Sequence, residues 1–235
     1  MNILAIDTAT EVFSVGISTA AGNFCFEAEA GKSHSELLFD AIDGLTRLAR
    51  IEREDIDVFA CIKGPGSFTG LRIGFAAVKG LALSLGKKII SVPSLDCMAY
   101  RFKSFTFLCV PVLDAKQHRF FAAFYRNGER LTDYMDCTAE ELARGITEYL
   151  GRAAPSEPRI ALLCGGGAEL AYNAVSGFLS GVNLLSDDSR TGRAPLLLQY
   201  IRKSGMLKNS EDERFSAPLY IRKSDAEIKR ASALN

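Results

Sequence analysis

Two aspartates, each at the end of a short apolar run, are the residues best placed to do chemistry in this sequence. Asp7 is followed by Thr8 and Thr10, and Asp114 is followed by residues 115–117. A carboxylate beside a turn suits phosphate and metal chemistry, because turn N–H groups face phosphate oxygens while the carboxylate holds a cation or water. Alternatively, each aspartate caps its own turn. We favour capping for Asp114, because Ala-Lys-Gln offers little hydroxyl chemistry.

The second chemical feature is a glycine-rich loop at 64–70, GPGSFTG, between a strand pattern at 58–62 and a helix pattern at 71–85. Such a loop binds an anion when its N–H groups and the helix dipole converge. The same glycines also suit a tight turn with close packing, so both interpretations stay open. The spacing fits neither the P-loop nor the Rossmann turn, whose third glycine is replaced by Thr69. The candidate vestigial phosphate-binding residues are Asp7, Thr8, Thr10, Gly64, Gly66, Gly165 and Gly166.

The histidines argue against metal and protease chemistry. The sequence has two, His34 and His118, and they form neither H-x-x-x-H nor H-E-x-x-H. There is no G-x-S-x-G nucleophile motif, although triad members need not be adjacent in sequence. We therefore predict no catalytic residue and no metal ligand. For His34, which opens a helix pattern, we predict a structural or interface role.

Composition narrows the class of protein. The formal net charge of zero provides no overall field to attract nucleic acid. The six cysteines form no C-x-x-C pair, and neither a signal peptide nor a long apolar span is evident. We expect a reduced, soluble, cytoplasmic protein with no membrane partner.

The order of the predicted elements repeats once along the chain. Asp7 matches Asp114, Ser33 matches Thr138, and Gly64 matches Gly165, with offsets of about one hundred residues. Ser33 and Thr138 each open a helix with a capping box. Two copies of βββαβα predict an α/β fold with two lobes, mixed sheets and a cleft between them. We place the lobes at 1–100 and 101–222 and predict a solvated polar tail at 223–235.

The helix pattern at 71–85 is apolar on more than one side. Leu71, Phe75 and Val78 form one stripe, and Gly74 and Ala77 lie on other faces. Glycine costs roughly 1 kcal/mol inside a helix, which close packing of a second helix would offset. Arg72 opposes the helix dipole and calls for an acidic partner nearby or across an interface. With the helix at 33–49, the predicted partner interface comprises His34, Leu38, Ile42, Leu45, Leu71, Arg72, Gly74, Phe75, Ala77 and Val78.

Five segments resemble the TsaB (YeaZ) family of tRNA threonylcarbamoyladenosine biosynthesis proteins. They are ILAIDTAT at 3–10, HSELL at 34–38, GPGSFTGLRIG at 64–74, PVLDAK at 111–116 and PLYIR at 218–222. The resemblance implies a duplicated actin-like ATPase (ASKHA, ribonuclease H-like) fold. It also implies pairing with the catalytic subunit TsaD, joined by TsaE, with tRNA contacted through the complex. The chain alone would form a homodimer. An M22 peptidase label accompanies the family, but no residue here supports it.

Two functions follow from these observations. The main hypothesis is a non-catalytic scaffold, a degenerate relative of the catalytic subunit, that requires no cofactor and binds ATP or ADP weakly. The alternative is a stand-alone ATPase or phosphotransferase of the sugar-kinase superfamily, working through Asp7, Thr8 and Thr10. Against the alternative, the second lobe offers no strong candidate for a general base.

Overall fold

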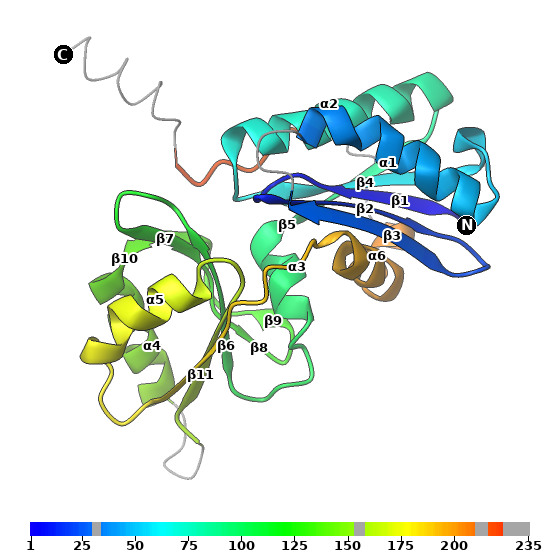
Figure 1. Ribbon diagram of the computed structural model, residues 1–235. Helices are drawn as coiled ribbons and strands as arrows, with labels where there is room; N and C mark the ends of the chain where they lie inside the picture. The colour runs from blue at the N-terminus through cyan, green and yellow to red at the C-terminus, as the bar shows by residue number, and fades with distance from the viewer. Residues whose placement is uncertain (30–33, 153–157, 210–215, 223–235) are drawn as a thin grey trace.

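The computed structural model describes residues 1–29, 34–152, 158–209 and 216–222 and has two lobes (Figure 1). The first capping box includes Ser33, which lies outside the described residues, as does the whole 223–235 tail. Each lobe contains one sheet with helices on both faces. The two-lobe prediction is therefore confirmed.

The first sheet has the strand order β3-β2-β1-β4-β5, with β1–β3 antiparallel and β4 and β5 parallel to β1. Its strands are β1 (Ile3–Asp7), β2 (Val12–Ser18), β3 (Asn23–Glu29), β4 (Val58–Gly64) and β5 (Lys88–Pro93). The connecting helices are α1 (His34–Ala49), the 3-10 turn η1 (Arg53–Asp55) and α2 (Phe68–Leu85). Every residue of β1 is buried, because Leu4 and Ile6 pack with α1 and α2 while Ile3 and Ala5 pack on the opposite face.

Helix α2 is defined at both ends by local chemistry. The Ser67 hydroxyl accepts a hydrogen bond from the Gly70 N–H as the N-cap, and Gly86 ends the helix in the left-handed conformation, with φ of 65°. Among the described residues, α2 alone is long and apolar enough to cross a membrane, with a mean hydropathy of 1.3. A core helix meets the same criteria, and α2 packs its buried side against the first sheet.

The second sheet repeats the first. Its main path is β10-β7-β6-β11-β12, with β8 and β9 attached beside β6. The strands are β6 (Leu108–Asp114), β7 (Arg119–Ala122), β8 (Tyr125–Arg126), β9 (Glu129–Arg130), β10 (Met135–Thr138), β11 (Ile160–Cys164) and β12 (Asn183–Asp187). The helices on its outer face are α4 (Ala139–Gly151), α5 (Ala168–Val175) and the 3-10 turn η2 (Ser176–Phe178). Thr138 caps α4 in the predicted capping box. The matching strand orders confirm the duplicated actin-like fold.

One strand that the sequence predicts is divided into two in the structure. The alternating pattern at 119–125 predicts a single strand, but the structure ends β7 at Ala122 and begins β8 at Tyr125. Between them, the Phe124 N–H donates to the Thr132 hydroxyl rather than to a strand partner. As a result β7 pairs with β10, whereas β8 forms a short hairpin with β9.

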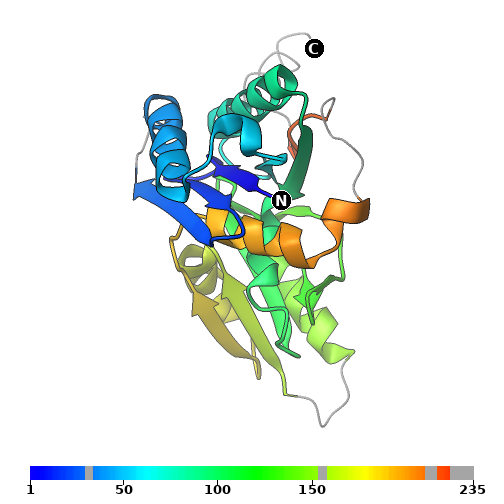
Figure 2. The same cartoon turned by 90° about the vertical axis from the view of Figure 1, so that its right-hand side faces the viewer.

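Two helices lie between the lobes, and each packs on the sheet formed by the other half of the chain (Figures 1 and 2). Helix α6 (Ala194–Lys203), from the second half of the chain, buries its apolar side against the inner face of the first sheet. The short helix α7 (Met206–Asn209) follows it. Helix α3 (Ser94–Tyr100), from the first half, packs Leu95 and Met98 on the second sheet. The rings of Tyr100 and Tyr200 join α3 to α6, with centroids 4.9 Å apart. The predicted boundary near residue 100 lies between the last strand of the first sheet and the first strand of the second. Helices α3 and α6, however, each pack on the sheet of the other half.

Candidate functional site

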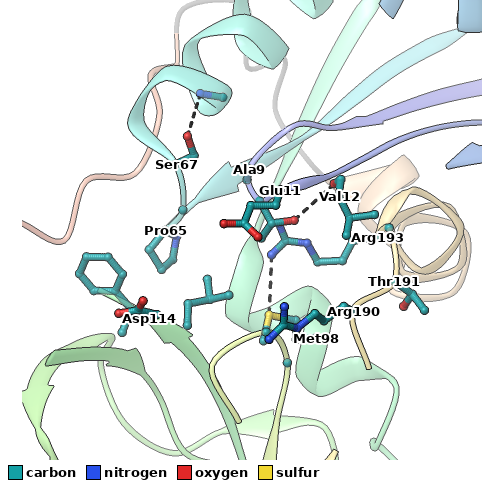
Figure 3. Close-up of a pocket in the computed structure, with 18 of the residues that line it drawn as sticks. Ala9, Glu11, Val12, Pro65, Ser67, Met98, Asp114, Arg190, Thr191 and Arg193 are labelled. Atoms are coloured by element: carbon teal, nitrogen blue, oxygen red, sulfur yellow. Dashed lines mark hydrogen bonds between the residues drawn. The ribbon is translucent and has the colours of Figure 1, made fainter. Parts of the chain in front are cut away.

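A cleft of about 1560 Å³ lies between the lobes (Figure 3). Its walls are the loops that follow β1, β4, β6 and β11, together with residues 187–193 and 219–222. All four loops leave the carboxyl ends of their strands, which is where α/β folds bind ligands. The duplicated topology therefore brings both aspartate turns and both glycine loops to one region.

Asp7 does not face this cleft, because it forms a buried ion pair with Arg193. Asp7 is fully buried and Arg193 is 6% exposed. The Arg193 guanidinium donates from Nε to Asp7 Oδ2 at 2.7 Å and from Nη2 to Oδ1 at 3.0 Å. The backbone N–H groups of Ala9 and Arg193 donate to the same carboxylate, at 2.9 and 3.2 Å. The four bonds leave this carboxylate little capacity for a metal ion or a water.

The charge of Arg193 is retained at this buried site. Burial lowers the pKa of Arg193, but the adjacent Asp7 carboxylate raises it by more, so the pKa lies above its ordinary value. The guanidinium therefore supplies the positive charge that a divalent cation would bring to an aspartate at this position. No spacing rule predicts this pair, since the two residues are 186 positions apart.

The two threonines of the turn after β1 also use their hydroxyl groups in hydrogen bonds within the protein. The Thr8 hydroxyl donates to the Gly70 carbonyl at 2.7 Å and is buried under α2. The Thr10 hydroxyl donates to the Val12 carbonyl at 3.3 Å, and Thr10 lines the cleft. Of the predicted phosphate-binding residues, Thr10, Gly66, Gly165 and Gly166 line the cleft, whereas Asp7, Thr8 and Gly64 do not. A phosphate role for the four cleft residues stays a prediction.

The glycine loop is built for close approach to β1. A Cβ atom at Gly66 would lie 2.4 Å from the Ala9 carbonyl oxygen, and one at Gly70 would lie 1.9 Å from the Thr8 carbonyl oxygen. The Ser67 N–H donates to the Ala9 carbonyl at 2.8 Å. These glycines therefore act in packing, and at least one loop amide is used within the protein rather than aimed at a ligand.

In the second lobe, Asp114 caps its own turn as predicted. Its carboxylate accepts from the Lys116 N–H at 2.7 Å and from Lys116 Nζ at 2.8 Å. Partial burial raises the pKa of Asp114, but these Lys116 contacts lower it by more, so the pKa lies below its ordinary range. Lys116 is exposed, with 77% of its side chain accessible. Asp114 is thus paired on its own turn and not presented as a free base.

His34 lies inside the first lobe. It is 5% exposed, and its ring centroid lies 5.8 Å from that of Phe13. Its Nε2 atom lies 3.4 Å from the Glu11 carbonyl oxygen. Among the described residues, no three His, Cys, Asp or Glu side chains come together as a set of metal ligands. His34 therefore holds the start of α1 against β2.

Burial overturns most of the predicted partner interface. The side chains of His34, Leu38, Ile42, Leu45, Leu71, Phe75 and Val78 are buried in the first lobe, and Gly74 is buried against Thr8. Arg72 is exposed and Ala77 is partly buried. An apolar stripe marks the side of a helix that is covered, and here the chain's own sheet covers it. The exposed side of α2 instead carries Arg72, Ala76, Gly80 and Leu83.

The structure adds a segment whose role the residue patterns did not reveal. We call residues 216–222 the C-terminal strap. The Leu219 N–H donates to the Lys63 carbonyl at 2.7 Å, and the Tyr220 ring stacks on Phe68 with centroids 4.4 Å apart. Further on, Arg222 lies 3.7 Å from Asp136 in the second lobe and contacts the Ala115 carbonyl. The strap thus joins the lobes at one edge of the cleft.

The chain is similar to known proteins along its length. The sequence model of the family described as TsaD, tRNA N6-adenosine threonylcarbamoyltransferase, matches residues 28–185. The chain is 25% identical over 232 residues to the tRNA threonylcarbamoyladenosine biosynthesis protein TsaB of Bacillus subtilis (strain 168), covering 97% of both chains. It is 33% identical over 132 residues to TsaB of Escherichia coli (strain K12), covering 55% of this chain and 57% of that protein.

Solved structures agree on the fold. An uncharacterized protein with similarity to peptidase YEAZ, from Pseudomonas aeruginosa, superposes with a TM-score of 0.75 at 22% identity, covering 94% of this chain and 99% of that one. The match of the family model to most of the chain decides the assignment. The chain therefore belongs to the TsaD (tRNA N6-adenosine threonylcarbamoyltransferase) family, in which its full-length similarity is to TsaB (YeaZ).

Proposed function

We propose that this chain is a non-catalytic scaffold subunit in the synthesis of threonylcarbamoyladenosine in tRNA, and that it docks on a TsaD-type transferase. The observation that carries the proposal is the buried pair of Asp7 and Arg193. An actin-like enzyme needs a carboxylate in its cleft to hold a metal ion or a water. Here that carboxylate is saturated by this chain's own guanidinium, which argues against the alternative of a stand-alone ATPase or phosphotransferase.

The docking surface that we propose is the outer side of α1 and α2, which lie side by side away from the second lobe (Figure 1). On α2 it carries Ala76, Gly80 and Leu83, while the exposed Phe39 and Leu48 of α1, nine positions apart, lie on the two flanks of the buried stripe of that helix. Leu48 is 68% exposed, Leu83 57% and Phe39 47%. An exposed apolar side chain such as Leu83 beside Ala76 and Gly80 suits an interaction site, because small residues allow a partner helix to approach closely.

Replacing Leu83 with glutamate should abolish co-purification with the TsaD-type transferase of the same organism. The change places an unpaired charge in the proposed interface, which should weaken binding at least about tenfold. The matched control is Phe178→Glu, since Phe178 is 54% exposed on η2 of the second lobe, away from this surface. Equal recovery of the transferase with both variants would reject the surface.

Magnesium should not strengthen the binding of ATP to the purified chain. The Asp7 carboxylate already accepts four hydrogen bonds, so a Mg²⁺–ATP complex would find no free ligand there. Calorimetry with ATP in magnesium and in EDTA should give the same weak binding in both, without turnover. Tight magnesium-dependent binding with hydrolysis would favour the enzyme alternative.

The remaining partners follow from the same proposal. TsaE joins the pair, tRNA is contacted through the complex, and the complex is cytoplasmic. In the absence of the transferase, the outer side of α1 and α2 is covered by a second copy of the chain. Light scattering should therefore give a dimer for the isolated wild-type chain and a monomer for Leu83→Glu.

A further inference from the structure

Arg72 is held in one orientation by two aromatic side chains. Its guanidinium carbon lies 4.1 Å from the centroid of the Phe68 ring, and Phe68 stacks on Tyr220 with an angle of 26° between the rings. The Arg72 Nε donates a long hydrogen bond of 3.4 Å to the Tyr220 hydroxyl. A guanidinium stacked on a ring and fixed at Nε directs the edge that carries its two terminal nitrogens away from the stack.

The residues that flank Tyr220 are attached to both lobes. Leu219 is bonded to the end of β4, and Arg222 contacts the second lobe through Ala115 and Asp136. Gly64 makes room for this anchoring, since a Cβ there would lie 2.6 Å from the Leu219 carbonyl oxygen. Tyr220 therefore lies between two attached residues, and little further ordering is required when Arg72 binds a partner.

The charge of Arg72 is not neutralised within the described part of the chain. No acidic residue lies in the first turn of α2, and no described carboxylate pairs with Arg72. The helix dipole opposes a cation at this end, so an external anion would be favourable. Arg72 also begins the exposed row of α2 that continues through Ala76, Gly80 and Leu83 at helical spacing.

We propose that Arg72 is a preorganised anchor for a carboxylate on the helix of the TsaD-type transferase that covers this row. A planar guanidinium binds a carboxylate through two parallel hydrogen bonds. The rest of the row is uncharged and consists of two small residues and Leu83, which suits a protein helix rather than a phosphate backbone. The proposal rests on the proposed function and deepens it, because it assigns an Asp or Glu to the partner and makes Tyr220 a positioning residue.

The test is the affinity of single variants for the transferase, measured by calorimetry at low and high salt. Arg72→Ala should weaken binding about 30-fold and reduce the dependence on salt. Arg72→Lys should remain about tenfold weaker, because a point charge lacks the planar fork. Arg144→Ala, at an exposed position on α4, is the matched control and should match the wild type. Urea midpoints within error of the wild type would show that the variants are folded.

Variants of Tyr220 test whether this residue positions Arg72 or contacts the transferase directly. Tyr220→Phe should cost about threefold, and Tyr220→Ala should approach the loss seen for Arg72→Ala. The double variant with Arg72→Ala should be no weaker than Arg72→Ala alone, because Tyr220 acts through Arg72. Additive losses would overturn the positioning role.

Three other outcomes would overturn the anchor. If Arg72→Ala binds like the wild type while Leu83→Glu does not bind, the docking surface stands and the anchor falls. If both variants bind like the wild type, the anchor and the proposed function fall together. If Arg72→Ala instead weakens only the binding of isolated tRNA, the guanidinium contacts a phosphate or a base and not the transferase.

Discussion

Replacing Asp7 with asparagine should lower the free energy of unfolding by about 3–5 kcal/mol. The substitution keeps the size of the side chain but removes the anion, so the buried guanidinium of Arg193 loses its counter-charge at a site that is 6% exposed. Arg193 is also the N-cap residue of α6, the helix from the second half of the chain that packs on the first sheet. Equilibrium unfolding in urea, followed by far-UV circular dichroism, measures the loss.

The matched control is Asp114→Asn at the corresponding turn of the second lobe. Its partner Lys116 is largely exposed, and solvent screens that pair. The expected loss is below about 1 kcal/mol. A second variant, Asp7→Leu combined with Arg193→Met, removes both charges and should recover part of the stability lost in Asp7→Asn. If Asp7→Asn were no more costly than Asp114→Asn, the pair would not have the structural importance that we assign to it.

A single methyl group at Gly70 should destabilise the protein by roughly 3 kcal/mol or more. The new Cβ would lie 1.9 Å from the Thr8 carbonyl oxygen, a backbone atom that moves only if β1 and α2 separate. Gly74→Ala should cost less, because its Cβ would meet the Thr8 hydroxyl at 2.6 Å and a side chain is able to rotate. Thermal and urea unfolding should show a larger loss of stability for Gly70→Ala than for Gly74→Ala.

Gly80→Ala is the control in the same helix and should change stability in the opposite direction. A Cβ at Gly80 would have no atom within 4 Å, and alanine favours the helix by about 1 kcal/mol over glycine. The three glycines of α2 therefore make a graded series from a tightly packed position to an open one. Destabilisation by Gly80→Ala, or tolerance of Gly70→Ala, would contradict the packing described for this helix.

Local residue chemistry determined the elements and their repetition. The apolar runs that end at Asp7 and Asp114 became β1 and β6, and the capping box at Thr138 opened α4. These features depend on neighbours within a few residues, where spacing and side-chain type decide the backbone conformation. The equivalence of the two halves was therefore predictable from the sequence, whereas the approach of the loops after β1 and β6 to one region became evident from the strand topology.

Tertiary structure alone decided the partner of Asp7 and the covered side of α2. Arg193 reaches Asp7 because α6 crosses to the other lobe, and no local pattern encodes a contact across 186 residues. The stripe of Leu71, Phe75 and Val78 shows that one side of α2 is buried, but periodicity does not tell whether the cover is the chain's own sheet or another protein. Local spacing determines which side of an element avoids water, and the packing of distant elements determines what covers it.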